Sequence, residues 1–159
     1  MKKIKIFFTA AIFLSALITI AAFKPLPAGP SANGQGTLTI PGDITRHFSF
    51  HVNTMPGGGV QGNGVLTYTG GVQKIMFDIN CMTIVGNIAY MSGIVTHWPS
   101  APENVGISCF FQVMDNGQGS GSSADRMSLL YFGGSLPIEC VDQEVGMSPI
   151  EGGNIQVKN

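Results

Sequence analysis

The sequence is poor in charged side chains. Only 11% of its 159 residues are Asp, Glu, Lys or Arg, against about a quarter in an average soluble domain. The part after residue 22 keeps five basic residues against nine acidic ones, a net charge of −4. A mildly acidic chain with so few cations lacks the basic surface with which proteins bind nucleic acids or anionic membranes. We therefore expect no nucleic-acid partner.

The usual catalytic and cofactor motifs are also lacking. The sequence contains no G-x-S-x-G, no H-E-x-x-H and no C-x-x-C, which are signatures of hydrolases, zinc proteases and zinc or redox sites. Residues 57–62, "GGGVQG", match the dinucleotide pattern G-x-G-x-x-G. That pattern needs a helix after it, whereas "NGVLTYT" follows and is typical of a strand. We expect no cofactor.

Residues 1–22 have the pattern of a secretory signal peptide. Lys2, Lys3 and Lys5 precede an apolar run that ends in small residues near position 22, and this run is short for a membrane span. A retained anchor or a buried helix is the alternative. We expect cleavage after residue 21 or 22, a secreted or periplasmic product, and no stable membrane anchor after cleavage. Residues 23–35 form a flexible Pro/Gly-rich lead-in, and 36–159 form one β domain.

The rest of the chain alternates apolar and polar residues with a period of two. Residues 45–52, "TRHFSFHV", place three apolar side chains on one face and His47, Ser49 and His51 on the other, as expected for a half-buried strand. Similar short segments recur, separated by turns rich in Gly, Pro and Asn. The pattern predicts an all-β fold, a single antiparallel β-barrel or barrel-like sandwich of about eight strands.

Residues 77–95 are interpreted as a hairpin that turns at Gly86-Asn87. Cys81 falls in the same alternation as Phe77 and Ile79, so we expect it to face the core. Of the three cysteines, an exported chain should pair two. We favour Cys81–Cys140, with Cys81–Cys109 as the main alternative; an unpaired Cys109 would be a small buried apolar residue.

Two stretches, "FDINCMTIVGNIAYMSG" and "FQVMDNGQGSGSSAD", resemble a pattern in secreted bacterial β-rich domains of unassigned function. That pattern has an Asp-x-x-Cys strand, a Gly-Asn turn, and an Asp-Asn-Gly-x-Gly loop that leads to an Asp. The resemblance covers roughly residues 47–140 and implies export and an all-β fold, without catalytic residues. The matching residues are Asp78, Cys81, Gly86, Asn87, Ala89, Ser92, Gly93, Val113, Asp115, Asn116, Gly117, Gly119 and Asp125.

Several polar residues are weak candidates for binding. Trp98, the only tryptophan, lies beside His97 in a Pro-rich loop, where it could stack on a sugar or cover the rim of a barrel. His47 and His51 share a strand face at a Cα separation of about 13 Å, too far apart to hold one metal ion together. Asp78 lies on the polar face of its strand, with no paired carboxylate visible nearby.

The loop "DNGQGSGSSAD" begins at Asp115 and ends at Asp125. Carboxylates on a Gly-rich loop could bind calcium, although the spacing of an EF-hand is absent. The alternative is turn chemistry, in which Asp accepts backbone hydrogen bonds.

Two classes of function follow from these observations. The first is a secreted, non-enzymatic β domain that binds a small molecule or a surface glycan, or that adheres to a surface. The second is a small β-barrel enzyme, a cyclase or isomerase that acts on an apolar substrate. A packed interior would favour the first, and a hollow interior lined by Asp78, His47 or His51 would favour the second.

Overall fold

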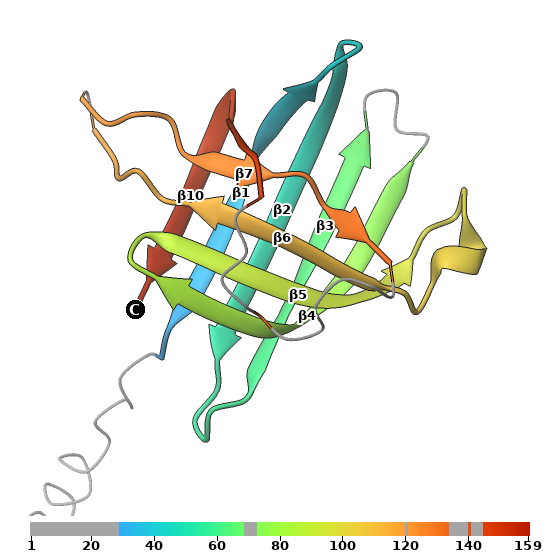
Figure 1. Ribbon diagram of the computed structural model, residues 1–159, viewed down its shortest axis with the longest axis horizontal. Coiled ribbons are helices and arrows are strands. Elements are labelled where there is room, and N and C mark those ends of the chain that lie inside the picture. The colour runs from blue at the N-terminus through green and yellow to red at the C-terminus, as the bar shows by residue number, and fades with distance from the viewer. Residues whose placement is uncertain (1–28, 69–72, 120, 134–139, 141–144) are drawn as a thin grey trace, which may run out of the picture.

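A computed structural model describes residues 29–68, 73–119, 121–133, 140 and 145–159. These residues form one antiparallel sheet, curled into a half-barrel (Figure 1). The expected all-β, barrel-like fold is confirmed, with ten strands in place of about eight. The strands are β1 (Ser31–Ile40), β2 (Ile44–Thr54), β3 (Val60–Tyr68), β4 (Lys74–Val85), β5 (Ile88–His97), β6 (Ser108–Met114), β7 (Arg126–Ser128), β8 (Tyr131–Phe132), β9 (Met147–Pro149) and β10 (Gly152–Lys158).

Neighbouring strands follow the order β10-β1-β2-β3-β4-β5-β6-β7-β9, and β8 also pairs with β6. A single 3₁₀ turn, Pro102–Asn104, interrupts the described β5–β6 connection. No helix among the described residues has the length and apolar character that crossing a membrane requires. The proposed signal peptide, residues 1–22, lies outside the described part of the chain.

The first strand begins earlier than expected. Residues 31–35, placed in the flexible lead-in by the sequence, form the first half of β1 and pair with both β2 and β10. Ala32 is fully buried, and the small residues that looked like linker residues alternate with polar ones, as a half-buried strand requires. The β domain therefore starts near residue 31 and not at 36.

The concave side of the sheet holds the core. Phe50 on β2, Phe77 on β4 and Phe111 on β6 meet there, and Phe111 contacts each of the other two rings edge-on at 5.5 Å between centroids. Such edge-to-face pairs add to the burial of apolar surface. The predicted alternation of β2 is confirmed, because Phe48, Phe50 and Val52 are buried while the residues between them are exposed.

Glycines on the concave side make room for these rings. Gly64 on β3 lies opposite both Phe50 and Phe77, and a Cβ there would overlap the Phe77 ring. The sequence predicts bulges or tight bends at the glycines of β3. The pairing of β3 with β2 is instead regular from Arg46 to Thr54, and the glycines serve the packing of aromatic rings.

The β4–β5 pairing has two register shifts, and the one that affects Cys81 is a bulge in β4 at Asn80. Ile79 pairs with Gly93 and Cys81 pairs with Ser92, so Asn80 is the extra residue. A β-bulge places two residues opposite one and shifts the alternation of the strand. Cys81 therefore points to the convex side, whereas Met82 and Ile84 pack on the core. The expectation that Cys81 faces the core is wrong for this reason.

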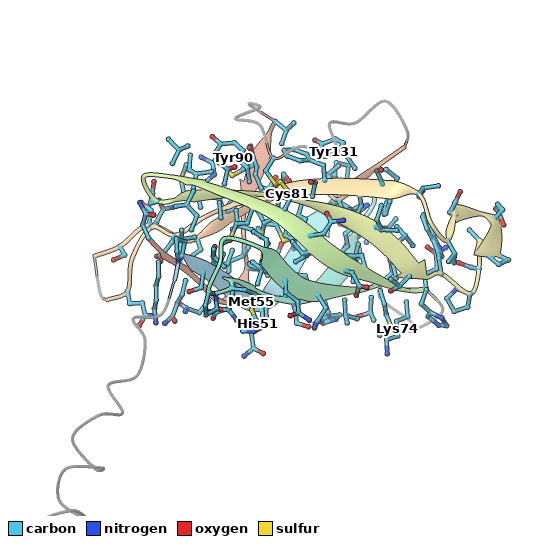
Figure 2. The ribbon with its side chains drawn as sticks, turned by 90° about the horizontal axis from the view of Figure 1, so that it is seen from below. His51, Met55, Lys74, Cys81, Tyr90 and Tyr131 are labelled. Atoms are coloured by element: carbon cyan, nitrogen blue, oxygen red, sulfur yellow. A yellow bond between two sulfur atoms is a disulfide. The ribbon has the colours of Figure 1, made fainter. Side chains whose placement is uncertain are left out.

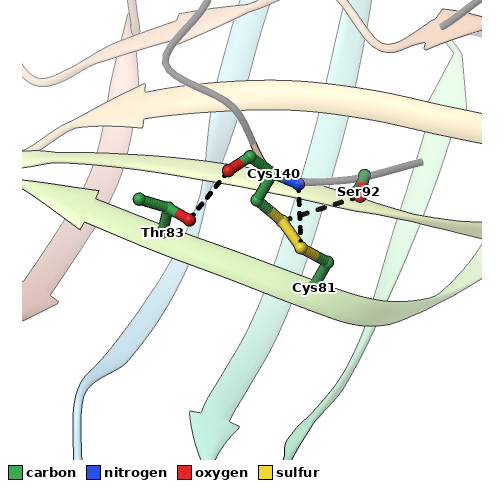
Figure 3. The surroundings of a disulfide bond; sticks show 4 residues. All are labelled: Cys81, Thr83, Ser92 and Cys140. Atoms are coloured by element: carbon green, nitrogen blue, oxygen red, sulfur yellow. Dashed lines mark hydrogen bonds between the residues drawn. A yellow bond between two sulfur atoms is a disulfide. The ribbon is translucent and has the colours of Figure 1, made fainter. Parts of the chain in front are cut away.

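The convex side of β4, β5 and β6 is covered at Cys140 (Figure 3). Cys140 forms the predicted disulfide with Cys81, and its carbonyl oxygen accepts a hydrogen bond from the Thr83 hydroxyl at 2.9 Å. Outward-facing residues on these strands are buried although they lie outside the core, among them Tyr90, Ser92, Phe110 and Gln112. The disulfide confirms the pairing that the sequence favoured and leaves Cys109 free.

Candidate binding face

The other half of the convex surface is bare and polar. It comprises the outward side chains of β10, β1, β2, β3 and β4 as far as Asn80, and we call it the amide face. In Figure 2, His51 and Lys74 project from this side of the molecule, opposite Tyr90 and Tyr131. Eight side-chain carboxamides lie on it, half-buried or exposed, from Asn33, Gln35, Asn53, Gln61, Asn63, Asn80, Asn154 and Gln156.

Strand pairing arranges these side chains in rows across the sheet. The central row runs from β10 to β4 and contains Gln156, Asn33, His51, Asn63 and Asp78, each paired with the next. Side chains directly opposite each other on neighbouring strands point to the same side and lie about 5 Å apart at Cβ. The row therefore offers five adjacent polar groups on one surface.

Three shallow hollows lie on the amide face. The first, about 380 Å³, is lined by residues of β10, β1, β2 and β3, and the second, about 480 Å³, by residues of β2, β3 and β4 with the turn after β2. All eight carboxamides line the first or the second, and these two hollows meet at His51 and Asn63, which line both. The third, about 560 Å³, adjoins the first along the strands at Gln35 and Ser49, and Gln35 is its single carboxamide. Among all residues that line the three hollows, Asp78 is the single charged one.

The chemistry of the hollows on the amide face is hydrogen bonding with a single charged group, Asp78, while Lys74 and Lys158 lie on the face outside the hollows. A carboxamide offers two donors and a carbonyl acceptor, so it can pair with a hydroxyl group in either role. Asn53 Nδ2 lies 2.8 Å from His51 Nε2, an interaction that orients the ring at the junction of the hollows. His51 and Asp78 are two strands apart, about 10 Å, and so do not form an acid–base pair.

The other sequence candidates lie outside the first two hollows. His47 is exposed on the same strand face as His51 and lines the third hollow. His97 is exposed at the end of β5, opposite Met76. Trp98 packs on Phe132, with 4.9 Å between ring centroids, and against the core. The structure thus brings together only His51 and Asp78 of the five proposed ligand-binding residues.

Asp115 and Asp125 hold the two ends of the sheet together. Asp115 Oδ2 accepts the backbone N–H of Val157 at 3.0 Å, and Asp125 Oδ2 accepts that of Ile155 at 2.7 Å. The remaining carboxylate oxygens bind backbone N–H groups within the Gly-rich loop, from Gly117 to Asp115 and from Asn116 to Asp125. Both carboxylates thus accept backbone hydrogen bonds within the loop, as expected for Asp in turns, and each also accepts one from the edge strand β10.

Calcium binding by Asp115 and Asp125 stays a prediction. Among the described residues, no three His, Cys, Asp or Glu side chains are grouped closely enough to hold a metal ion. If calcium binds, a chelator should lower the melting temperature of the protein.

The interior of the half-barrel is filled. The cavity beside Phe48 and Leu66 has a volume of about 10 Å³, roughly the least that accommodates one water molecule. Arg46 lies at this end with its guanidinium 4.9 Å from the centroid of the Tyr68 ring, and its buried Nε has no protein hydrogen-bond partner.

Cys109 is a buried thiol on the concave side of β6. Burial raises the pKa of its thiol to about 12, and a backbone hydrogen bond at Gly93 acts in the opposite direction. A thiol that stays protonated at neutral pH is a poor nucleophile. Cys109 therefore belongs to the core, as the sequence analysis anticipated for an unpaired cysteine.

The carboxamides leave a signal in the sequence, but one too general to mark a binding site. Polar amides alternate with Gly or apolar residues in "NGQ" at 33–35, "QGN" at 61–63 and "NIQ" at 154–156. Each segment alone is typical of any exposed strand face. Comparison of the chain with models of protein families, with curated proteins and with solved structures finds no match.

Proposed function

We propose that this chain is an exported, non-enzymatic domain that binds a hydroxyl-rich, uncharged ligand, a surface glycan, on its amide face. The observation that carries the proposal is the field of eight carboxamides over five strands with Asp78 as the one charge in its hollows. About a quarter of the residues in an average soluble domain are charged, and most of them are exposed. Hollows so depleted of charge match a neutral ligand that both donates and accepts hydrogen bonds.

The filled interior supports a surface site over an enclosed one. An enzyme that shapes an apolar substrate needs a cavity of several hundred Å³, and the cavity beside Phe48 measures about 10 Å³. The imidazole of His51 and the carboxylate of Asp78 stand two strands apart and so form no acid–base pair. The cyclase or isomerase alternative therefore has no feature of the described residues in its favour.

Binding on such a face should be weak at each site. No Trp, Tyr or Phe side chain projects outward from the described amide-face strands, so a sugar ring has no aromatic platform. A hydrogen bond exchanged against water contributes only about 1 kcal/mol. Useful retention then needs several contacts along one ligand or several copies of the domain on one surface.

Affinity electrophoresis in gels that contain soluble polysaccharides tests the proposal. Uncharged polysaccharides should slow the protein, whereas anionic ones should not. The triple variant Asn33→Thr, Gln61→Thr, Asn63→Thr keeps strand-forming residues at exposed positions and should migrate as in a plain gel. A matched control, Ser122→Ala and Ser123→Ala in the exposed loop, should still be retarded. Equal migration of wild type and triple variant in every gel contradicts the proposal.

Export is tested separately. The Cys81–Cys140 disulfide is consistent with an oxidising compartment. Expression of the full chain in a bacterium should give a product outside the cytoplasm whose N-terminal sequence starts at residue 22 or 23. A product retained in the cytoplasm with its first Met would contradict export without bearing on the glycan proposal.

A further inference from the structure

We infer that the ligand on the amide face is a single extended chain of uncharged sugars that lies across the strands, from β10 to β4. The inference rests on the proposed function and adds a direction, a length and a crossing point. Its basis is the position, relative to the strands, of the first two hollows, which are lined by all eight carboxamides. They meet at His51 and Asn63 and extend from there to opposite edges of the face.

The two hollows define the path. The first contains Asn154 and Gln156 of β10 but nothing of β4, and the second contains Asp78 and Asn80 of β4 but nothing of β10. A ligand that fills both must cross β1, β2 and β3 on its way. A ligand parallel to the strands would fill the first hollow and the third, which has one carboxamide, and would leave the second hollow empty with its four carboxamides. The crossing point is the shared pair, His51 and Asn63.

The spacing of the central row suits a chain of sugars. Adjacent strands lie about 4.8 Å apart, close to the length of one pyranose unit in an extended chain. From Gln156 to Asp78 the row covers four such steps, or about 19 Å. Each sugar unit would therefore meet a new amide, imidazole or carboxylate group, and about four units would span the row.

Because the sheet is twisted, its amide face fits a single glycan chain better than the flat surface of a crystalline polysaccharide. Neighbouring strands rotate by about 20–25° relative to one another, so the direction of outward side chains turns by roughly 80–100° over the four steps of the row. A flat crystal face can touch only a part of such a surface. A flexible single chain can follow it.

The test is a titration of ¹⁵N-labelled protein with uncharged oligosaccharides of increasing length, built from glucose, mannose or xylose. Affinity should rise with each added unit to about four and then level off, because the row spans about four strand spacings. Shifted amide signals should include the side chains of both hollows. Crystalline cellulose should not retain the protein.

His51 and His97 form a matched pair for the crossing point. Both are exposed histidines on strands, but His97 lies at the end of β5, outside the amide face. His51→Ala should weaken binding of the four-unit oligosaccharide about three- to tenfold, the loss expected for one hydrogen-bonding side chain, and His97→Ala should leave it unchanged.

The possible results separate the two proposals. Binding that does not strengthen beyond one sugar, equal effects of His51→Ala and His97→Ala, or tight retention on crystalline cellulose would overturn the across-strand chain while the glycan function stands. No response to any uncharged saccharide, by titration or in the gels, would overturn both. Length-dependent binding that is lost in His51→Ala alone supports the inference.

Discussion

Asp125 on the loop before β7 binds the edge of β10 directly, through a hydrogen bond of 2.7 Å from the backbone N–H of Ile155 to Oδ2. The Asp125 carbonyl oxygen accepts a second backbone bond, from Ile150, at 2.9 Å. The carboxylate is 6% exposed, so its bonds are shielded from water. β10 and β7 are not paired in the sheet. The hydrogen bonds of Asp125 therefore connect the segment before β7 to β10 where no strand pairing does.

Asp125→Asn should destabilise the fold. Asn has one acceptor oxygen and an NH₂ group in place of the second. The backbone N–H of either Asn116 or Ile155 would therefore face another donor and lose its hydrogen bond. Leaving one buried N–H unpaired costs about 1–3 kcal/mol. The midpoint of urea unfolding should fall accordingly, with no change in slope.

Asp78→Asn is the matched control for Asp125→Asn. It makes the same chemical change at an exposed position, where surface substitutions usually alter stability by less than about 0.5 kcal/mol. If both variants unfold at the same urea concentration as wild type, Asp125 does not hold the sheet ends together.

Loss of the disulfide should lower stability strongly. Cys81 and Cys140 are 59 residues apart in sequence, and closing a loop of that length restricts the unfolded chain by about 4 kcal/mol on the chain-entropy argument. The double variant Cys81→Ala, Cys140→Ala should therefore unfold at much lower urea than the oxidised protein. Reduced wild type should behave like the double variant; reduced and oxidised protein of equal stability would contradict the prediction.

The alternation of apolar residues predicted the fold class because the alternating apolar side chains are the ones that pack in the core. Phe48, Phe50 and Val52 occupy one face of β2 as the pattern requires, and Gly86-Asn87 forms the expected turn between β4 and β5. Cys81 shows where this reasoning stops. A bulge at Asn80 depends on how β4 pairs with β5, and no period within β4 alone reveals it.

The candidate site was only partly predictable for a related reason. His51 and Asp78 were visible as polar residues on strand faces, but their neighbours come from segments far apart in the chain. Gln156 lies beside Asn33 because β10 pairs with β1, and a sequence does not give that register. The same limit applies to Asp115 and Asp125, whose partners on β10 depend on where the last strand lies.

Cys109 should resist thiol reagents in the folded protein. With a pKa raised to about 12 by burial, almost no thiolate exists at pH 8, and the thiolate is the reactive form. A disulfide-intact sample should therefore bind about one equivalent of a thiol reagent in denaturant and almost none without it. Fast labelling in native buffer would contradict this prediction.

The same thiol gives a pH dependence with a defined sign. The unfolded chain releases this proton near pH 9, whereas the folded chain keeps it until about pH 12. The unfolded state then binds fewer protons between these values, so stability falls as pH rises from 9 towards 12. Below pH 8 Cys109 should contribute no pH dependence. Urea unfolding of wild type and Cys109→Ala across this range measures the difference in slope.

Gly93 marks the close contact that the β4 bulge creates. It lies on the concave side opposite Ile79, next to the extra residue, and a Cβ at this position would overlap the carbonyl oxygen of Asp78. Gly93→Ala must therefore push β4 and β5 apart. Overpacking of this kind costs about 1–3 kcal/mol or more, and urea unfolding should show it.

The control for Gly93→Ala is Gly59→Ala, where an added Cβ meets no atom within 4 Å. That variant should match wild type, because the change adds only a small side chain in open space. Since Cys81 lies directly beyond the bulge, Gly93→Ala should also slow formation of the disulfide from reduced protein. Mass spectrometry of samples alkylated at successive times measures that rate. Unaltered stability and disulfide formation in Gly93→Ala would mean that the close approach at the bulge does not position Cys81.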